Sequence, residues 1–134
     1  MSSSSPENLR LFLQMFVSSY EELEVLLFFA RGVRQSWTAN ELAAALRKPA
    51  EPVATALSQL AARGLLESEA RTELAYRYAV TNDELRLRIA ELDRAYEHER
   101  LSVVQMMSDN ALERIRRSAI RGMSDAFGPI YGKK

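Results

Sequence analysis

Cysteine is absent from the 134-residue sequence, and histidine occurs once. Disulfides, thiolate metal sites and cysteine nucleophiles are therefore excluded, and one histidine is too few for a histidine-rich metal site. Neither sign of charge is in excess, because 18 Lys and Arg balance 18 Asp and Glu. This balance excludes a strongly basic nucleic-acid coat and a polyacidic tail. Glycine and proline are also scarce, with 5 and 4 residues, which favours long regular elements with few turns.

Long apolar runs are lacking as well. The most apolar short stretch, residues 25–30, is much shorter than the roughly 20 residues that span a bilayer. The first residues lack the basic and apolar parts of a signal peptide, so we expect a cytoplasmic location and no membrane contact. The sequence has no phosphate-binding glycine loop, no HExxH and no nucleophile elbow. We therefore expect no catalytic residue, no bound metal and no cofactor.

Three Ser/Thr-x-x-Glu patterns of the capping-box type predict helix starts at Ser19, Thr38 and Thr81. Apolar residues follow each of them at helical spacing. Pro52 suits the first turn of a further helix, and Gly64 suits a left-handed cap at its end. The predicted helices of this part cover 20–31, 41–47 and 51–63, and a longer helix starts at 83.

Two strands are expected between Gly64 and the long helix. The first starts at residues 65–67, and a polar stretch over 69–72 suits a turn. Residues 74–80 alternate with a period of two, which is typical of a strand. The face expected to point inward carries Leu74, Tyr76, Tyr78 and Val80.

Both ends of the chain carry helical patterns. A serine-rich tail over 1–7 precedes a dense apolar segment over 8–17, which we interpret as an added helix. After Asp83 the apolar residues keep nearly heptad spacing, and the polar triplet 108–110 is expected to interrupt this arm. A last helix is expected over 111–127, with an inward face of Leu112, Ile115, Ala119, Ile120 and Met123.

The order helix, short helix, helix, strand, turn, strand is the outline of a winged helix-turn-helix. The stretch from Trp37 to Leu46 reads WTANELAAAL and looks like the second-helix pattern T-x-x-E-L-A-x-x-L of the MarR-like winged helix-turn-helix superfamily. Residues 53–67 read VATALSQLAARGLLE and look like its recognition helix, which ends in L-x-x-x-G-L. The resemblance covers residues 20–80. It implies DNA binding by a homodimer whose terminal helices form the dimer.

The expected fold class is mainly α with a small β-hairpin wing. We predict a tail and N-terminal helix over 1–19, a winged helix-turn-helix domain over 20–80 and a C-terminal helical dimerisation arm over 81–134. An arm with this many large apolar residues is not expected to remain exposed on a monomer. The predicted dimer interface consists of Leu85, Ile89, Leu92, Tyr96, Val103, Ile115 and Ile120.

The predicted function is that of a transcriptional regulator that binds double-stranded DNA. Its recognition helix would lie near 51–63 and its wing near 65–80, and Gln59 has the amide that pairs with adenine. Basic residues at the ends of helices and in the wing would contact phosphate or the minor groove. The full set of predicted DNA-binding residues is Arg47, Lys48, Thr55, Ser58, Gln59, Arg63, Arg71 and Arg77.

A second interpretation stays open, in which the winged helix is a protein–protein interaction module with little or no DNA binding. Glu51 is acidic where phosphate would approach, and the wing carries three glutamates beside its two arginines. Arg47, Lys48 and Arg63 also stand at helix C-termini, where a basic residue complements the helix dipole without any ligand. The densest basic cluster, residues 114–121, suits a solvated helix face or pairing between chains.

Overall fold

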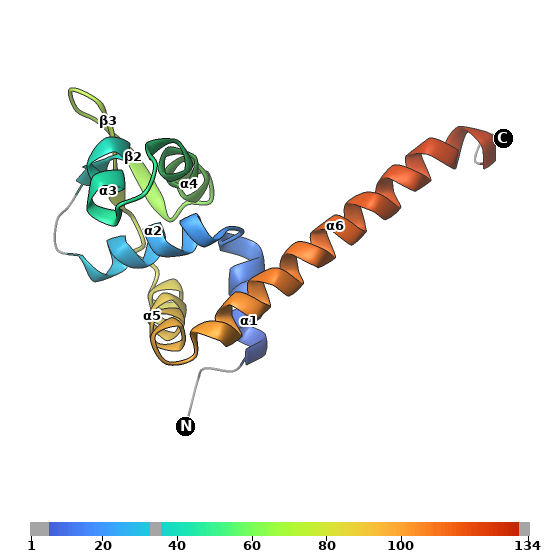
Figure 1. Cartoon of the computed structure of the whole chain (residues 1–134), viewed down its shortest axis with the longest axis horizontal. Helices are drawn as coiled ribbons and strands as arrows, with labels where there is room; N and C mark the ends of the chain where they lie inside the picture. The colour runs from blue at the N-terminus through green and yellow to red at the C-terminus, as the bar shows by residue number, and fades with distance from the viewer. Residues whose placement is uncertain (1–5, 33–35, 132–134) are drawn as a thin grey trace.

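A computed structural model of the chain describes the backbone of residues 6–32 and 36–131, and side chains within 7–32 and 36–121. Most of the described residues are helical, and three short strands form one antiparallel sheet (Figure 1). The mainly α class with a small β-hairpin is thus confirmed. Most of the expected tail, residues 1–5, lies outside the described residues. The elements are α1 (Pro6–Phe16), α2 (Tyr20–Arg31), β1 (Ser36–Thr38), α3 (Ala39–Leu46), α4 (Ala50–Ala62), β2 (Leu66–Ala70), β3 (Leu74–Tyr78), α5 (Asp83–His98) and α6 (Arg100–Tyr131).

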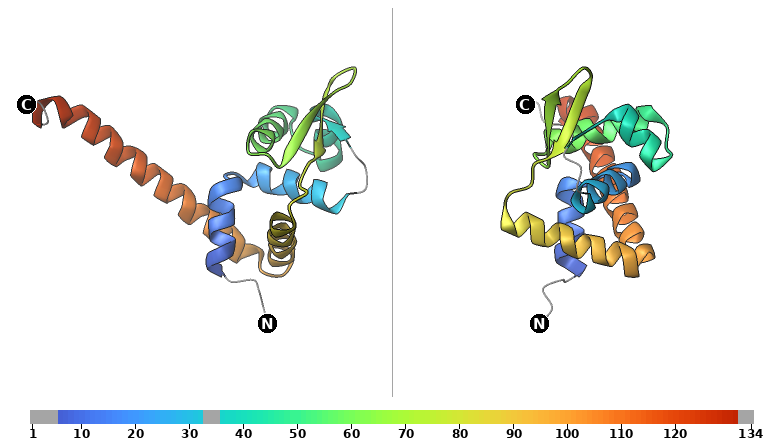
Figure 2. Two further views of the ribbon diagram at one scale, coloured as in Figure 1. Left: turned by 180° about the vertical axis from the view of Figure 1, so that it is seen from behind. Right: turned by 90° about the vertical axis from the view of Figure 1, so that its left-hand side faces the viewer.

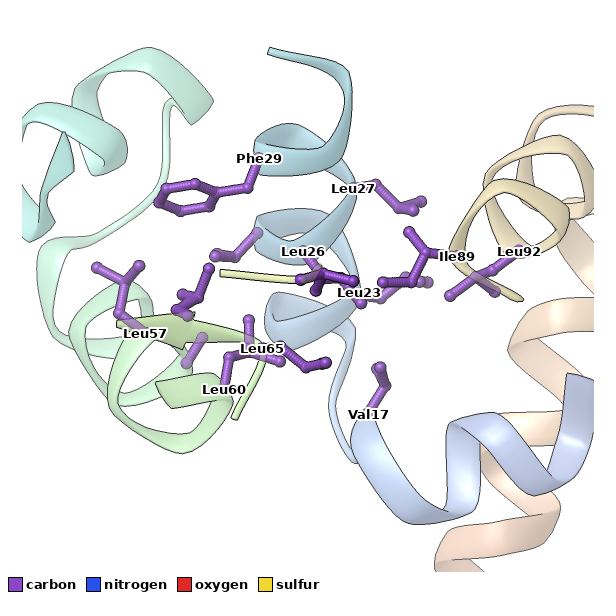
Figure 3. Close-up of a cluster of buried hydrophobic side chains, with 14 of the residues drawn as sticks. Val17, Leu23, Leu26, Leu27, Phe29, Leu57, Leu60, Leu65, Ile89 and Leu92 are labelled. Carbon is purple, nitrogen blue, oxygen red and sulfur yellow. The ribbon is translucent and has the colours of Figure 1, made fainter. Parts of the chain in front are cut away.

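Helix α2 forms the centre of the hydrophobic core. In Figure 3, Leu57 and Leu60 of α4 lie on one side of α2, and Ile89 and Leu92 of α5 lie on the other. A helix that is apolar on most of its circumference is expected to be buried in this way. The buried residues of α2 are Glu22, Leu23, Val25, Leu26, Leu27 and Phe29.

The three strands are ordered β1–β3–β2, with β3 in the centre. The short strand β1 was not predicted. It pairs with β3, and its Trp37 lies opposite Tyr76 of β3. The expected inward face of β3 is partly wrong, because Ala75 is buried and Leu74 is 58% exposed. Leu74 pairs with the last residue of β2 at the tip of the hairpin, which extends past the helices (Figure 2). No described helix covers the tip of the hairpin, so the alternating pattern of β3 does not place Leu74 in the core.

The predicted capping boxes are formed to different degrees. At α3 the box is complete, because Thr38 and Glu41 each accept a backbone N–H of the other. At α2 the Ser19 hydroxyl accepts the Glu22 N–H, but the Glu22 carboxylate accepts the N–H of Ser18 instead of closing the box. Helix α5 begins at Asp83 as predicted, but its side-chain cap is Asn82 instead of Thr81.

The C-terminal arm consists of two helices that break at Glu99, where the heptad spacing is weakest. The predicted interruption over 108–110 is wrong, since α6 continues through these residues. Asn110 is buried there, and its side-chain amide donates to the Arg10 carbonyl at 3.3 Å. A polar side chain that finds its hydrogen-bond partner on a neighbouring helix does not have to interrupt the helix that carries it.

Helix α6 leaves the rest of the molecule about halfway along its length. Its first part packs against α1 and α5, and its second part extends away from all other elements in Figures 1 and 2. The arrangement corrects the expected inward face of the last helix, because Leu112, Ile115, Ala119 and Ile120 are all exposed. The side chain of Met123 lies outside the described residues.

Four of the predicted dimer-interface residues are instead part of the chain's own core. Ile89, Leu92, Tyr96 and Val103 are each at most 4% exposed, and Leu85 packs on the same cluster. The nearly heptad spacing of this segment therefore reflects packing of α5 and α6 against α1 and α2. Ile115 and Ile120 remain exposed and accessible to a partner.

Candidate nucleic-acid interface

Helix α4 has one face in the core and the other in solvent. The β2–β3 hairpin stands beside it (Figures 1 and 2). The apolar stripe predicted for this helix is buried, namely Val53, Ala56, Leu57 and Leu60. The polar residues predicted to contact DNA are exposed, namely Thr55, Ser58 and Gln59.

A tight turn sets the direction of α4 after α3. Arg47 ends α3 in the left-handed region with φ 58°, and its N–H and that of Lys48 donate to carbonyls of the last turn of α3. This geometry is typical of a helix C-cap. Pro49 then precedes α4 in extended conformation, so three residues separate the helices. The side chain of Arg47 is exposed and makes no ion pair among the described residues.

Arg63, predicted to bind DNA, is engaged within the protein. Its guanidinium donates to the Glu22 carboxylate, to the Phe16 carbonyl at 2.9 Å and to the Ser18 hydroxyl at 3.2 Å. The Glu22 side chain is only 6% exposed. Arg63 therefore neutralises a buried carboxylate and ties the end of α4 to the α1–α2 junction. Its predicted DNA contact stays a prediction, and it would require this ion pair to open.

Lys48 also turns inward, toward α2. Its ammonium nitrogen lies 3.6 Å from a carboxylate oxygen of Glu24 and 5.1 Å from the ring centre of Tyr20. The Tyr96 hydroxyl bonds to the Tyr20 hydroxyl at 2.9 Å and to Glu24 at 3.2 Å. Lys48 thus completes a polar cluster between α2, α5 and the α3–α4 turn. Its predicted DNA contact stays a prediction, and it would require Lys48 to leave this cluster.

The two arginines of the hairpin are exposed but paired. Arg71 bonds to Glu41 of α3, with a closest distance of 3.1 Å, and this bond raises the pKa of its guanidinium. The guanidinium of Arg77 lies 2.6 Å from a carboxylate oxygen of Glu67 and 3.9 Å from one of Glu69, both on the other strand of the hairpin. Exposed ion pairs contribute only about 0–1 kcal/mol, so each arginine can exchange its glutamate for a phosphate. The glutamates would nevertheless remain beside that phosphate and repel it.

The charge of the whole face is slightly acidic. Its basic side chains are Arg47, Arg71 and Arg77, and its acidic side chains are Glu41, Glu51, Glu67, Glu69 and Glu73. Glu51 stands in the first turn of α4, where the helix dipole stabilises a carboxylate. Phosphate contacts supply most of the non-specific affinity for DNA, and this face offers few of them.

A groove of about 490 Å³ runs between α4 and the start of α2. Glu21 and Glu51 line it together with Thr55, Gln59 and Arg63. Because Arg63 is already paired with Glu22, the free charges of the groove are negative. A cationic or neutral polar group fits this groove better than an anion.

Comparison with models of known protein families, with curated proteins and with solved structures finds no match to this chain. The evidence for a function therefore comes from the residues of the site. Among the described residues, no cluster of histidine and carboxylate side chains suited to a metal ion is present. No helix in the part of the chain that the structure describes is long and apolar enough to cross a membrane.

The ion pair of Arg63 with Glu22, which are 41 residues apart, was not predicted. No local pattern predicts such a pair. The role of Arg114, whose guanidinium donates to the Ser18 carbonyl at 3.4 Å, was not predicted either. Both arginines bind the α1–α2 junction, one from α4 and one from α6. The serine pair at 18 and 19 was visible in the sequence, but only as a helix start.

Proposed function

We propose that this chain is a DNA-binding transcriptional regulator of the winged-helix type that acts as a homodimer. The observation that carries the proposal is the position of α4. Its apolar stripe is in the core, while its polar face is uncovered beside a two-stranded hairpin. A short turn from the preceding helix holds it there, and an exposed helix of this kind fits the major groove of DNA.

Gln59 is the residue best suited to read a base. A glutamine amide pairs with two groups of adenine in the major groove. Arg63 donates only a long bond of 3.5 Å to the Gln59 oxygen, so the amide is available. Thr55 and Ser58 are exposed next to it and have hydroxyls suited to bases or phosphates.

Arg47 supplies the phosphate contact that costs least to make, because it has no ion pair to give up within residues 7–32 and 36–121. Only a few phosphates are neutralised by each copy on this account. The slope of log K against log salt is about −0.9 for each phosphate neutralised, so we expect a shallow salt dependence. Tight binding would then require a two-fold site that both copies contact.

The experiment begins with selection of duplexes from a random-sequence library on immobilised protein. Fluorescence anisotropy then measures the affinity for the recovered duplex. Arg47→Gly removes the charge while keeping the left-handed backbone favourable. We expect about tenfold weaker binding and unchanged thermal stability. The matched control is Arg94→Ala on α5, which removes one exposed charge away from α4 and should change the affinity less than twofold. Failure to recover any duplex would overturn the proposal.

A protein-interaction module is the second candidate, and the acidic character of the α4 face favours it. The partner would present a basic segment to the groove that Glu21 and Glu51 line. Octalysine, with octaglutamate as control, is a suitable probe. Chemical shifts that move at α4 with octalysine, in a protein that selects no duplex, would establish this function in place of the first.

A further inference from the structure

A basic side chain stands at each end of α4, and carboxylates of α2 hold both of them. Lys48, in the turn before α4, faces Glu24. Arg63, which follows the last residue of α4, pairs with Glu22. The two carboxylates are two residues apart on α2. Helix α2 therefore draws inward the positive charges that stand before and after α4.

The two ion pairs differ in how easily they open. Arg63 donates to the Glu22 carboxylate and to two further oxygen atoms, and the Glu22 side chain is only 6% exposed. Opening this pair leaves a buried carboxylate without its counter-charge. Lys48 lies 3.6 Å from Glu24, beyond ordinary hydrogen-bond length, and the Glu24 side chain is 24% exposed. Water can take the place of the lysine there, so Lys48 is the cation that a phosphate can draw away.

The helical arm holds Glu24 from the other side. The Tyr96 hydroxyl of α5 donates to a carboxylate oxygen of Glu24 at 3.2 Å. The guanidinium of Arg100, the first residue of α6, lies 4.5 Å from the centre of the Tyr96 ring. The Tyr96 ring meets the Tyr20 ring edge to face, and Lys48 lies over the ring of Tyr20. These contacts link the start of α6 to the turn before α4.

We propose that the contact between Glu24 and Lys48 is an autoinhibitory latch, in which Glu24 withholds Lys48 from DNA while Tyr96 of the arm keeps Glu24 in place. This inference rests on the proposed function, because it concerns the same surface. The long, flexible stem of a released Lys48 lets its charge join that of Arg47, the preceding residue of the turn. Each copy then gains one phosphate contact, and displacement of Tyr96 strengthens DNA binding.

Replacement of the carboxylate by an amide tests the latch. Glu24→Gln keeps an oxygen for the Tyr96 hydroxyl but removes the charge that holds Lys48. Anisotropy at low salt should show about fivefold tighter binding of the selected duplex, with a salt slope steeper by about 0.9, the value for one phosphate. The matched control is Glu97→Gln, which removes an exposed charge from α5 and should change the affinity less than twofold. Equal gains would reflect net charge alone and would overturn the latch.

A second substitution shows whether Lys48 makes the gained contact. Lys48→Met added to Glu24→Gln should return both the affinity and the salt slope to the wild-type values. Retention of the gain in this double variant would overturn the latch. A loss of the same size on Lys48→Met in the wild type would also overturn it, because Lys48 would then contact DNA without any release.

Lysine labelling tests the latch in the absence of DNA. The sequence has three lysines, and the other two are at 133 and 134, so peptide mass spectrometry can follow Lys48 separately. Acetic anhydride should modify Lys48 at least fivefold more slowly than free Nα-acetyl-lysine amide, and both Glu24→Gln and Tyr96→Phe should accelerate the reaction. Equal rates for wild-type Lys48 and the free amide would overturn the latch alone in a protein that selects a duplex. Slow labelling in a protein that selects no duplex would overturn the proposed function.

Discussion

The molecule has two uncovered surfaces, and they differ in chemistry. The face of α4 and the hairpin is polar and slightly acidic, while α6 exposes large apolar side chains, Leu112 and Ile115 among them. An apolar surface gains free energy from almost any apolar partner of matching shape, so it suits a lasting contact. A polar face gains only from a partner that matches its hydrogen bonds and charges. This difference in chemistry favours α4 over α6 as the surface for the proposed recognition.

The largest expected effect concerns the ion pair that holds the end of α4. Arg63→Met leaves the Glu22 carboxylate buried without its counter-charge, which we expect to destabilise the fold by about 3 kcal/mol. Denaturant unfolding measures the change. The double variant Arg63→Met with Glu22→Gln should recover more than half of the loss. No recovery would show that the arginine acts by packing alone.

The second prediction sharpens the charge argument at α4. Glu51→Arg reverses a charge at the first turn of the exposed helix, and it should raise the affinity for the selected duplex about tenfold. Anisotropy at two salt concentrations should also show a steeper salt dependence. Glu97→Arg on α5 is the control, since this exposed residue lies on a different helix. Equal gains in both variants would mean that α4 is not the surface that contacts DNA.

A third prediction concerns the alkaline limit of stability. Burial raises the pKa of Tyr96, and its hydrogen bond to Tyr20 raises it further. The unfolded chain then loses this proton near pH 10, before the folded chain does, so stability falls as the pH rises above about 10. In Tyr96→Phe the decrease in Tm between pH 9 and pH 11 should be smaller than in the wild type. An identical decrease would contradict this assignment.

The smallest expected effect is at the hairpin. Arg77→Ala removes an exposed ion pair and should change the free energy of unfolding by less than about 1 kcal/mol. Duplex binding should weaken two- to threefold if the hairpin contacts DNA. An effect on stability as large as that of Arg63→Met would show that the hairpin is part of the core structure.

Sequence reasoning succeeded where a pattern is local. The stripe of α4 is buried at Val53 and Leu57 as predicted, and Gly64 adopts the predicted left-handed conformation with φ 87°. Capping and spacing are determined within a few residues, so the sequence contains them.

Partners that are distant in the sequence could not be predicted. The spacing that placed Ile89 and Leu92 on one face was correct, but a periodic pattern does not show whether that face meets the same chain or another copy. Lys48 was predicted to contact DNA because it stands at the turn before α4, and its ion pair with Glu24 on a separate helix could not be predicted from that turn. The internal partners of Lys48 and Arg63 were missed for this reason.

Amide hydrogen exchange with and without the selected duplex shows which surface contacts DNA. We expect slower exchange over 50–62 and 66–78 when DNA is added. Exchange over 100–121 should not change when DNA is added. Protection by DNA that falls on α6, near the arginines at 116 and 117, and leaves α4 unchanged would contradict the assignment of recognition to α4.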